Sequence, residues 1–174
     1  MRAVAGGQGR GERSVNPRLA GAVLRSGSGG AVGRLRPIGV IRSTLKSRTG
    51  APRQGSEGAP DAWLDVRPWA RRGLRGVAAG DEILVVTWLH RARRDVLEVH
   101  PRSDGRRRLA GVFATRSPDR PNPLGLHPVV VRAIDGTRLR IGPIEAIDGT
   151  PVVDIKPALP RRGVRAPRGR RPAP

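Results

Sequence analysis

The segment from residue 129 to residue 141 constrains the fold most strongly, because its apolar residues recur with a period of two. The alternation stops at Asp135-Gly136-Thr137, a combination typical of a tight turn, and resumes directly afterwards. Two alternating runs on either side of such a turn predict a β-hairpin rather than a helix. The side chains expected on its buried face are those of Val129, Val131, Ala133, Leu139 and Ile141.

Other apolar segments of the chain are equally short. Residues 38–43 predict a strand, and the continuous apolar run at residues 82–90 is typical of a strand that is buried on both faces. Residues 148–151 predict a second tight turn, after which residues 152–155 predict another strand. We therefore expect a mainly β domain of about five to seven short strands, which favours a small β-barrel over a sandwich.

The remaining segments are less regular. Residues 44–60 form a long loop rich in Gly, Pro and Ser, and loops of this length in a compact domain are often functional. We expect a strand within residues 63–69, followed by a short helix at residues 71–77. After an Arg-rich bend, residues 91–99 predict one more strand, which leads into a polar loop.

Both ends of the chain are strongly basic. The 174 residues carry a formal net charge of +20, of which residues 1–36 and residues 161–174 contribute +6 each. These ends lack a periodic apolar pattern, so we expect disordered basic tails around one folded domain at residues 37–160. The domain itself retains +8, which indicates a polyanionic partner such as nucleic acid. For residues 1–30, an Arg- and Gly-rich proteome or a start assigned too early is the alternative explanation.

The chain lacks the residues that several classes of site require. It has no cysteine, which excludes disulfides and Cys-ligated metals, and its three histidines show no spacing typical of a metal site. No apolar run reaches the roughly 18 residues of a membrane span, and no signal peptide is evident. The motifs of the common nucleotide-binding folds and of serine hydrolases are also absent. We expect a cytoplasmic protein without metal or membrane attachment.

Three loops combine polar side chains with a backbone that proline and glycine restrict. The first, "APRQGSEG" at residues 51–58, holds Arg53 and Gln54 between a proline and a glycine. The second, "GVFATRSPDRPNPLGL", holds Arg116, Arg120 and Asn122 among three prolines, so these side chains lose little entropy on binding a ligand. The third is "IDGTPVVDIKP". For each loop taken alone, a surface loop or turn without function is the alternative.

Taken together and in this order, the motifs resemble those of the TsaA-like family. The resemblance covers about residues 37–160 and rests on "IGVIRS", "PRQG", "GVFATRSPDRPNPLGL" and "DGTPVVDIKP". Characterised bacterial members of that family are the tRNA (adenine-N6)-methyltransferases called TrmO. The resemblance implies a TsaA-like β-barrel that binds S-adenosyl-L-methionine, forms a homodimer with the cofactor near the subunit interface, and acts on tRNA. In TrmO the methyl group goes to N6 of threonylcarbamoyl-adenosine at position 37 of the tRNA, next to the anticodon.

The resemblance also implies which residues contact the cofactor. They belong to the first loop, to both ends of the proline-rich motif and to the last turn, where an arginine suits a carboxylate and a leucine suits the face of an adenine. Asp81 and Glu82 stand where longer bacterial members carry a Ser-His pair of the cofactor site. The other implied cofactor-binding residues are Pro52, Arg53, Gln54, Arg116, Leu126, Asp148, Gly149, Thr150 and Pro151.

The expected reaction also needs a group that takes the proton of a weakly nucleophilic N6. The sequence leaves three candidates, and Arg120 and Asn122 are expected to contact the RNA substrate. His127 replaces a serine that is usual in the family, and we interpret it as a polar residue at the start of a strand. The candidate proton acceptors are Asp148, Asp119 and Asp154.

Two features leave a different function open. The chain stops soon after the last motif, whereas larger members of the family continue into a further small domain. Asp81 and Glu82 also depart from the family's Ser-His pair. The alternative is a barrel that binds S-adenosyl-L-methionine but acts on a different small molecule, or that serves as a non-catalytic, ligand-responsive module.

Overall fold

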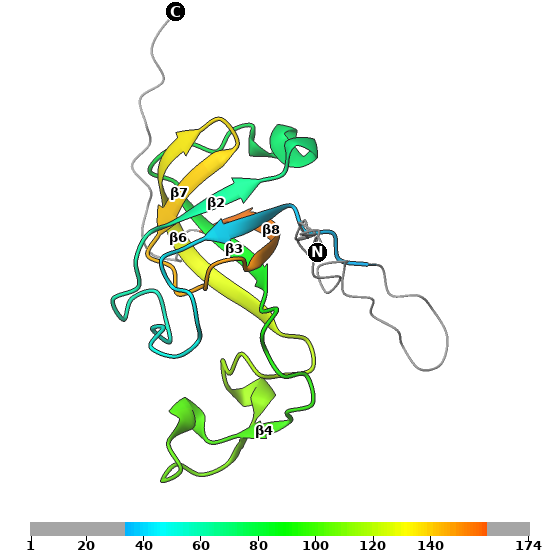
Figure 1. The fold of residues 1–174 in the computed structure, drawn as a ribbon, viewed down its shortest axis with the longest axis vertical. Coiled ribbons are helices and arrows are strands. Elements are labelled where there is room, and N and C mark those ends of the chain that lie inside the picture. The colour runs from blue at the N-terminus through cyan, green and yellow to red at the C-terminus, as the bar shows by residue number, and fades with distance from the viewer. Residues whose placement is uncertain (1–33, 160–174) are drawn as a thin grey trace, which may run out of the picture. The chain divides into compact units, whose positions relative to one another are not determined.

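The computed structural model describes residues 34–159 of the chain. The tails that the sequence predicts to be disordered, residues 1–36 and 161–174, therefore lie outside the described residues except for residues 34–36. From residue 37 to residue 159 the chain forms a single mainly β unit (Figure 1).

Six antiparallel strands of this unit close into a barrel in the order β1-β2-β7-β6-β3-β8 (Figure 1). β8 pairs with both β1 and β3 and thereby completes the ring. The predicted small β-barrel is therefore confirmed. Its strands are β1 (Gly39–Arg42), β2 (Ala62–Val66), β3 (Glu82–Trp88), β6 (Leu124–Asp135), β7 (Arg138–Gly142) and β8 (Pro151–Pro157).

The predicted hairpin joins β6 to β7. Asp135 pairs with Arg138 across the turn, and Gly136 takes a φ of 59°, a conformation that a side chain would disfavour. Leu139 and Ile141 are completely buried, as the period of two predicts. Local turn chemistry was therefore sufficient to predict this part of the fold.

Aliphatic side chains from all six strands fill the barrel. Strand β2, for example, turns every second side chain inward, so that Leu64 is buried between neighbours that are only half-buried. Burying one such aliphatic side chain contributes about 1.5–3 kcal/mol. The completely buried aliphatic residues are Ile41, Leu64, Val85, Val112, Val131, Leu139, Ile141, Ile144 and Val152.

The two ends of the barrel carry different segments. The long-loop end carries residues 43–61, 89–123 and 143–150, because β1, β3 and β7 end there. The hairpin end carries residues 67–81 and the turn between β6 and β7. Most of the irregular chain, and all three motifs with unusual polar residues, thus lie at the long-loop end.

One prediction, a strand over residues 91–99, is wrong in extent. Only β4 (Glu98–Val99) is extended, and it pairs with β5 (Ala110–Gly111) outside the barrel. The residues around Arg93 form the predicted Arg-rich bend, in which the Arg93 side chain bonds to Asp95 and the Arg93 N–H donates to a side-chain oxygen of Asp119. The β4–β5 pair belongs to the excursion that leaves the barrel after β3 and returns at β6 (Figure 1).

The other irregular segments form short 3₁₀ helices. The helix predicted at residues 71–77 is the 3₁₀ helix η2 (Pro68–Leu74), which begins earlier because Pro68 suits a first helical position. The strand predicted within residues 63–69 is β2, which ends at Val66. The excursion contains two further 3₁₀ turns, η3 (Pro101–Ser103) and η4 (Val112–Ala114).

Candidate functional site

Backbone hydrogen bonds hold the last turn against the chain that follows β1. The N–H of Asp148 donates to the carbonyl of Leu45 at 2.7 Å, and the N–H of Gly149 donates to the carbonyl of Ile41 at 2.8 Å. Thr150 is buried, and its hydroxyl donates to the carbonyl of Ile147 at 2.7 Å. Residues 148–151 therefore begin β8 in a fixed position at the long-loop end.

The carboxylate of Asp148 strengthens the same junction. One oxygen accepts the Ser43 N–H at 3.1 Å, and the other lies 3.1 Å from Nζ of Lys46. Burial alone would raise the pKa of Asp148, but the hydrogen bonds from Ser43 and Lys46 and the nearby positive charges hold this pKa below its ordinary value. Both oxygens are thus engaged in joining two segments.

Asp119 performs a similar role between three loops. Its carboxylate accepts from Nη2 of Arg48 at 2.8 Å and from the N–H of Arg93 at 2.8 Å. Burial opposes ionisation of Asp119, but the hydrogen bonds and charges of these two arginines lower its pKa overall. The proline-rich motif is thereby tied to residues 44–60 and to the start of the excursion.

The arginines of the proline-rich motif are used in different ways. Arg120 turns back onto its own loop, where its guanidinium donates to the carbonyls of Val112, Thr115 and Ser117. Arg116 is exposed, and its side chain makes no hydrogen bond or ion pair with another described residue. Arg120 therefore shapes the loop, whereas the Arg116 side chain takes no part in holding it.

At Asn122 and at Gln54 of the first loop, the backbone carbonyl accepts a hydrogen bond while the side chain is exposed. The backbone carbonyl of Asn122 accepts the Leu124 N–H at 2.8 Å, and the side chain of Asn122 is exposed to solvent. The carbonyl of Gln54 accepts the N–H of Glu57 at 3.0 Å, and the side chain of Gln54 is exposed. Arg53 is exposed without a partner among the described residues.

The first loop also approaches the segment after β7 very closely. A side chain on Gly55 would place its Cβ 2.7 Å from the carbonyl oxygen of Pro143, which is too short for a real contact. Pro52, three residues earlier, is half-buried. The first loop and the segment leading to the last turn are therefore in direct contact through Gly55.

Leu126 lies on the outer face of the barrel. Its side chain is 49% exposed, and the register places it beside Val86 of β3, which in turn pairs with Asp154 of β8. The Asp154 carboxylate accepts from the N–H of Ile155 at 2.9 Å and lies 2.8 Å from Nζ of Lys156. Leu126, Val86 and Asp154 thus form one row across three neighbouring strands.

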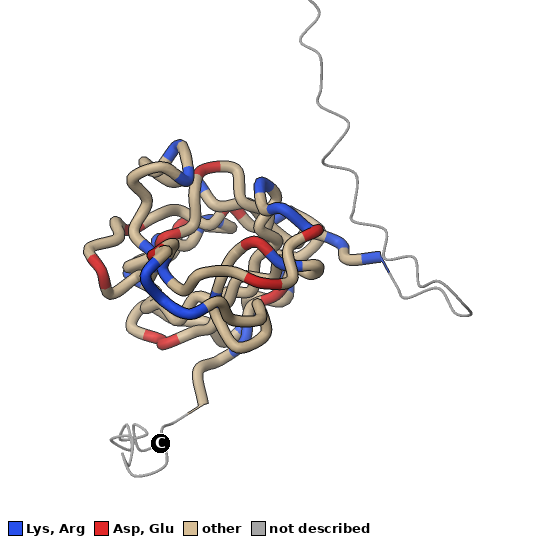
Figure 2. The backbone as a smooth tube through the Cα atoms, turned by 90° about the horizontal axis from the view of Figure 1, so that it is seen from below, with Lys and Arg blue, Asp and Glu red and all other residues tan. Residues whose placement is uncertain are grey.

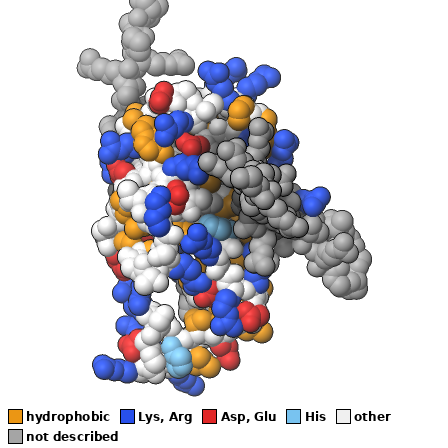
Figure 3. Space-filling model, viewed as in Figure 1, with side chains coloured by type: hydrophobic (Ala, Val, Ile, Leu, Met, Phe, Trp, Pro, Cys, Tyr) orange, Lys and Arg blue, Asp and Glu red, His pale blue; other side chains and the backbone are white. Residues whose placement is uncertain are grey.

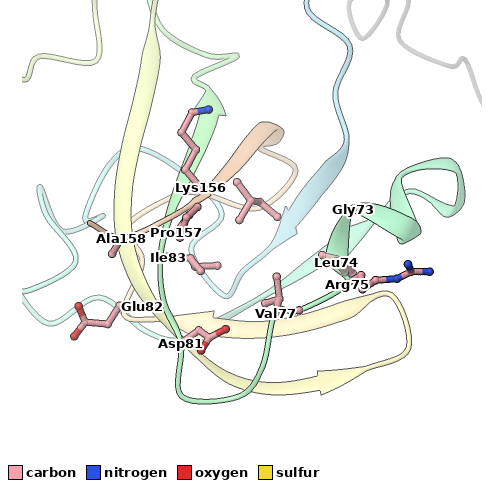
Figure 4. Close-up of a pocket in the computed structure, with 12 residues that line it drawn as sticks. Gly73, Leu74, Arg75, Val77, Asp81, Glu82, Ile83, Lys156, Pro157 and Ala158 are labelled. Atoms are coloured by element: carbon pink, nitrogen blue, oxygen red, sulfur yellow. The ribbon is translucent and has the colours of Figure 1, made fainter. Parts of the chain in front are cut away.

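Asp81 and Glu82 lie apart from the other predicted residues. They precede and begin β3 at the hairpin end, whereas Trp88 ends the same strand at the long-loop end, about 20 Å away at ~3.3 Å per residue. Both line an open cavity of about 530 Å³ together with Val77 and the end of β8 (Figure 4). A carboxylate oxygen of Asp81 accepts the Ala78 N–H at 2.8 Å.

A second cavity, of about 750 Å³, opens beside Asp148 at the long-loop end. Most of the residues around it are charged or polar, but the surface that they present to the cavity is mainly apolar, and Trp63 is the aromatic member. The basic residues around it are Arg42, Lys46 and Arg140, two of which pair with the acidic residues Asp61 and Asp65. On the face shown in Figure 3, basic and acidic side chains are likewise interspersed.

His127 has surroundings that the sequence did not suggest. It is the fourth residue of β6 and not its first, and it is buried inside the barrel. Its ring contacts Thr87 on one side and Glu145 on the other. Neither partner was a predicted site residue. The signal was present, because extending the alternation backward from Val129 places position 127 on the inner face.

The comparisons with known proteins agree with one another. The model of the tRNA-methyltransferase O N-terminal domain family matches residues 40–162. A protein of Methanothermobacter thermautotrophicus named as a probable S-adenosyl-L-methionine-binding protein is 43% identical over 125 residues, which is 71% of this chain and 88% of that relative. A similarly named protein of Rhizobium radiobacter is 40% identical over 121 residues, covering 69% of this chain and 67% of the relative.

Solved structures show the same likeness. The crystal structure of TrmO from Pseudomonas aeruginosa superimposes with a TM-score of 0.61 at 30% identity and covers 80% of this chain. The match spans 61% of that TrmO chain, and an Archaeoglobus fulgidus relative, 44% identical, is matched over 33% of its length.

Residues 34–159 lack two further kinds of feature. None of the helices there is both long enough and apolar enough to cross a membrane. Nor does this part of the chain contain a group of three or more His, Cys, Asp or Glu side chains placed to hold a metal ion.

Proposed function

We propose a function from one premise, that the chain belongs to the family of tRNA-methyltransferase O N-terminal domains. We propose that the protein transfers a methyl group from S-adenosyl-L-methionine to N6 of threonylcarbamoyl-adenosine at position 37 of a tRNA. The observation that carries the proposal is the contrast between rigid loops and unpaired guanidinium groups. The side chains of Arg53 and Arg116 have no partner among the described residues. In contrast, Arg48 and Lys46 form ion pairs with Asp119 and Asp148 that join loop segments.

The donor set at the long-loop end fits this cofactor. A guanidinium group can hold a carboxylate with two parallel hydrogen bonds, so Arg116 or Arg53 would bind the amino-acid end of the cofactor. The exposed side chain of Leu126 offers an apolar surface for an adenine. The backbone of residues 148–151 and the amide of Gln54 supply further polar groups.

The role of the protein is then mainly to orient the reactants. The sulfonium centre of the cofactor supplies both the methyl group and a good leaving group, so alignment with N6 accounts for most of the acceleration. Such alignment requires loops that do not move. The contacts of Asp119 and Asp148 provide this rigidity, and Arg120 adds three hydrogen bonds within the proline-rich motif.

The N6 proton must be taken up, and we assign this task to Asp154. The carboxylates of Asp119 and Asp148 each connect different segments, and their lowered pKa makes them weak bases. Asp154 connects no segments, since its partners are its neighbour Ile155 and the exposed Lys156. It also lies in the same row as Leu126.

A homodimer would explain the position of Asp81 and Glu82. Within one chain they lie at the hairpin end of β3, four residues along the strand from Val86, the partner of Leu126, and farther from the candidates at the long-loop end. A second copy of the chain could bring them to the same cofactor site. The exposed Leu124 and Leu126 on the outer face of β6 provide apolar surface for such a contact.

A tRNA partner is consistent with the charge of the chain. Lys and Arg outnumber Asp and Glu in the sequence, and in the described backbone they occur in many separate stretches (Figure 2). Phosphate contacts from such charges strengthen binding without selecting a sequence. Removing residues 1–34 and 162–174, which are rich in arginine, should make log affinity for tRNA less dependent on log salt. An unchanged slope would show that these segments do not bind. If the substrate is tRNA, we expect the protein to act in the cytoplasm.

The second candidate is a barrel that binds S-adenosyl-L-methionine without acting on tRNA. It is favoured by the names of the archaeal relatives, which specify binding of this molecule and no reaction. It would act on another small molecule or respond to the cofactor as a non-catalytic module.

Mass spectrometry of tRNA nucleosides distinguishes the two candidates. Deleting the gene should remove the N6-methyl group from threonylcarbamoyl-adenosine, and the intact gene should restore it. A gene with Arg116→Ala should not restore it, whereas Arg138→Ala, on the outer face of β7, should. If the methylated nucleoside persists in the deletion strain while the pure protein binds the cofactor, the second candidate is correct.

A further inference from the structure

A polar cluster inside the barrel has no part in the proposed reaction. Thr87 of β3 is 0% exposed, and its hydroxyl lies 2.8 Å from Nε2 of His127, which is 3% exposed. Nδ1 of His127 lies 2.9 Å from a carboxylate oxygen of Glu145, in the segment after β7. Thr87 and His127 are thus polar side chains in a mainly aliphatic core, and the half-buried Glu145 extends their chain of contacts toward the surface. This arrangement requires an explanation because burying polar groups is costly.

The proton positions in this cluster follow from its chemistry. Burial opposes ionisation of Glu145, but the hydrogen bond and charge of His127, together with backbone N–H groups, lower its pKa. An ionised carboxylate can only accept, so Nδ1 of His127 carries a proton and donates it to Glu145. The Thr87 hydroxyl can donate or accept at Nε2. Every contact between the three side chains is therefore satisfied.

The order hydroxyl, imidazole, carboxylate is that of a nucleophilic triad, but the surroundings prevent such chemistry. No substrate can reach the buried Thr87 hydroxyl. The backbone of Gly125 also packs directly against the pair, because even a Cβ at this position would collide with both Thr87 and His127. The cluster must therefore act through the segments that it joins.

Those segments are the ones that carry the proposed cofactor contacts. Gly55, directly after Gln54, lies against the carboxylate of Glu145. A Cβ on Gly55 would lie 3.5 Å from a carboxylate oxygen of Glu145. His127 directly follows Leu126, and Glu145 precedes Asp148 by three residues. The cluster thus lies against the first loop at Gly55 and against the proline-rich motif at Gly125, and Glu145 shortly precedes the last turn in the sequence.

We propose that His127 is a positioning residue: through Glu145 it fixes the "PRQG" loop and the turn at residues 148–151 relative to β6. This inference rests on the proposed cofactor site at the long-loop end. His127 touches neither cofactor nor substrate. Its effect is to keep Arg53 and Gln54 at a constant position with respect to Leu126.

The test compares two substitutions of His127 in the full-length protein. An asparagine places an amide nitrogen near the position of Nδ1 and can still donate to Glu145. A glutamine reaches the position of Nε2 and keeps only the contact with Thr87. If the link to Glu145 positions the loop, calorimetry with S-adenosyl-L-methionine should show near-normal affinity for His127→Asn and a loss of about tenfold for His127→Gln.

A matched control separates positioning from stability. Val131→Ala creates a cavity on the same strand, β6, away from the cluster, and should lower the melting temperature without a change in cofactor affinity. Hydrogen exchange of the Gly55 amide adds a readout that needs no cofactor. Exchange should be faster than in the wild type for His127→Gln and unchanged for His127→Asn and Val131→Ala.

Each outcome decides the inference. Equal cofactor affinities and equal Gly55 exchange in the two His127 variants would overturn it, as would an equal loss of affinity in Val131→Ala. If the wild-type protein does not bind S-adenosyl-L-methionine, the proposed function fails. The exchange of the Gly55 amide then still decides whether His127 positions the loop.

Discussion

In the barrel, Leu64 of β2 faces its partner Leu139 of β7 with both side chains completely buried, whereas at the long-loop end Asp119 and Asp148 join loops through charged hydrogen bonds. Apolar burial depends little on pH or salt, while the contacts of a carboxylate depend on its ionisation. The comparison teaches that the loop geometry can be lost while the barrel remains folded. Four predictions use this difference.

The largest effect is expected from Arg116→Ala. We expect methyl transfer to be lost and the barrel to remain folded, because the exposed Arg116 side chain has no partner among the described residues that it could leave behind. An unpaired ligand carboxylate costs roughly 2–5 kcal/mol. At 1.4 kcal/mol per tenfold, cofactor affinity should fall by about 30- to several-thousand-fold, as measured by calorimetry.

Two variants control for general electrostatic effects. Arg116→Lys should recover only part of the affinity, because a point charge cannot reproduce a bidentate contact. Arg138→Ala should leave affinity unchanged, since Arg138 is exposed and contacts Asp65 and the ring of Trp63. Similar losses in Arg116→Ala and Arg138→Ala would show that the charge acts diffusely.

The opposite result, a loss of stability without a loss of cofactor affinity, is expected from Leu64→Ala. Removing this buried side chain should lower the free energy of unfolding by about 2–5 kcal/mol, because a cavity remains in the core. At a temperature where the variant is still folded, cofactor affinity should equal that of the wild type. A large loss of affinity under those conditions would mean that core and loops are not separable.

A smaller effect that depends on pH is expected from Asp119→Asn. The variant keeps an acceptor for the Arg93 N–H but loses the charge that faces Arg48, which is worth about 1 kcal/mol for a partly exposed pair. The folded pKa of Asp119 is lowered, so its contribution is complete above the unfolded value of about 3.9 and is lost as the pH falls through the folded pKa. Wild type should therefore melt above Asp119→Asn at neutral pH and equal it in strong acid. A constant difference at all pH values would contradict this assignment.

Chelation of metal ions should have no effect on cofactor affinity. The proposed cofactor contacts are guanidinium, amide, backbone and apolar groups, none of which requires a metal ion. Calorimetry in EDTA should give the same affinity for S-adenosyl-L-methionine as calorimetry without it. Binding that disappears with EDTA and returns with a divalent cation would show that the site is incomplete as described.

The sequence predicts the barrel well where local chemistry decides the structure. The turn at Gly136 and the alternation on both sides of it were sufficient for the β6–β7 hairpin. The segment at residues 91–99 was predicted less well, because its strand tendency yields to contacts with Asp119, far away in sequence. Such a contact has no local signature.

The candidate site shows the same limit at the level of single residues. Arg116 and Arg120 stand in similar sequence surroundings, but only the path of the loop reveals that Arg120 bonds to backbone carbonyls. The order of the motifs along the sequence does not give the distances between them. The separation of Asp81 and Glu82 from the candidates at the long-loop end is therefore evident only from the folded barrel. The predicted roles of Arg120 and Asn122 toward RNA stay predictions.

Closure of the barrel limits how this protein can associate with itself. Since β8 pairs with both β1 and β3, the ring exposes no open sheet edge to which another chain could add a strand. Fibril-like growth from the barrel is therefore disfavoured, even at high concentration. Association through the barrel would instead use side chains such as the exposed Leu124, so a few surface substitutions would be enough to evolve, strengthen or abolish it.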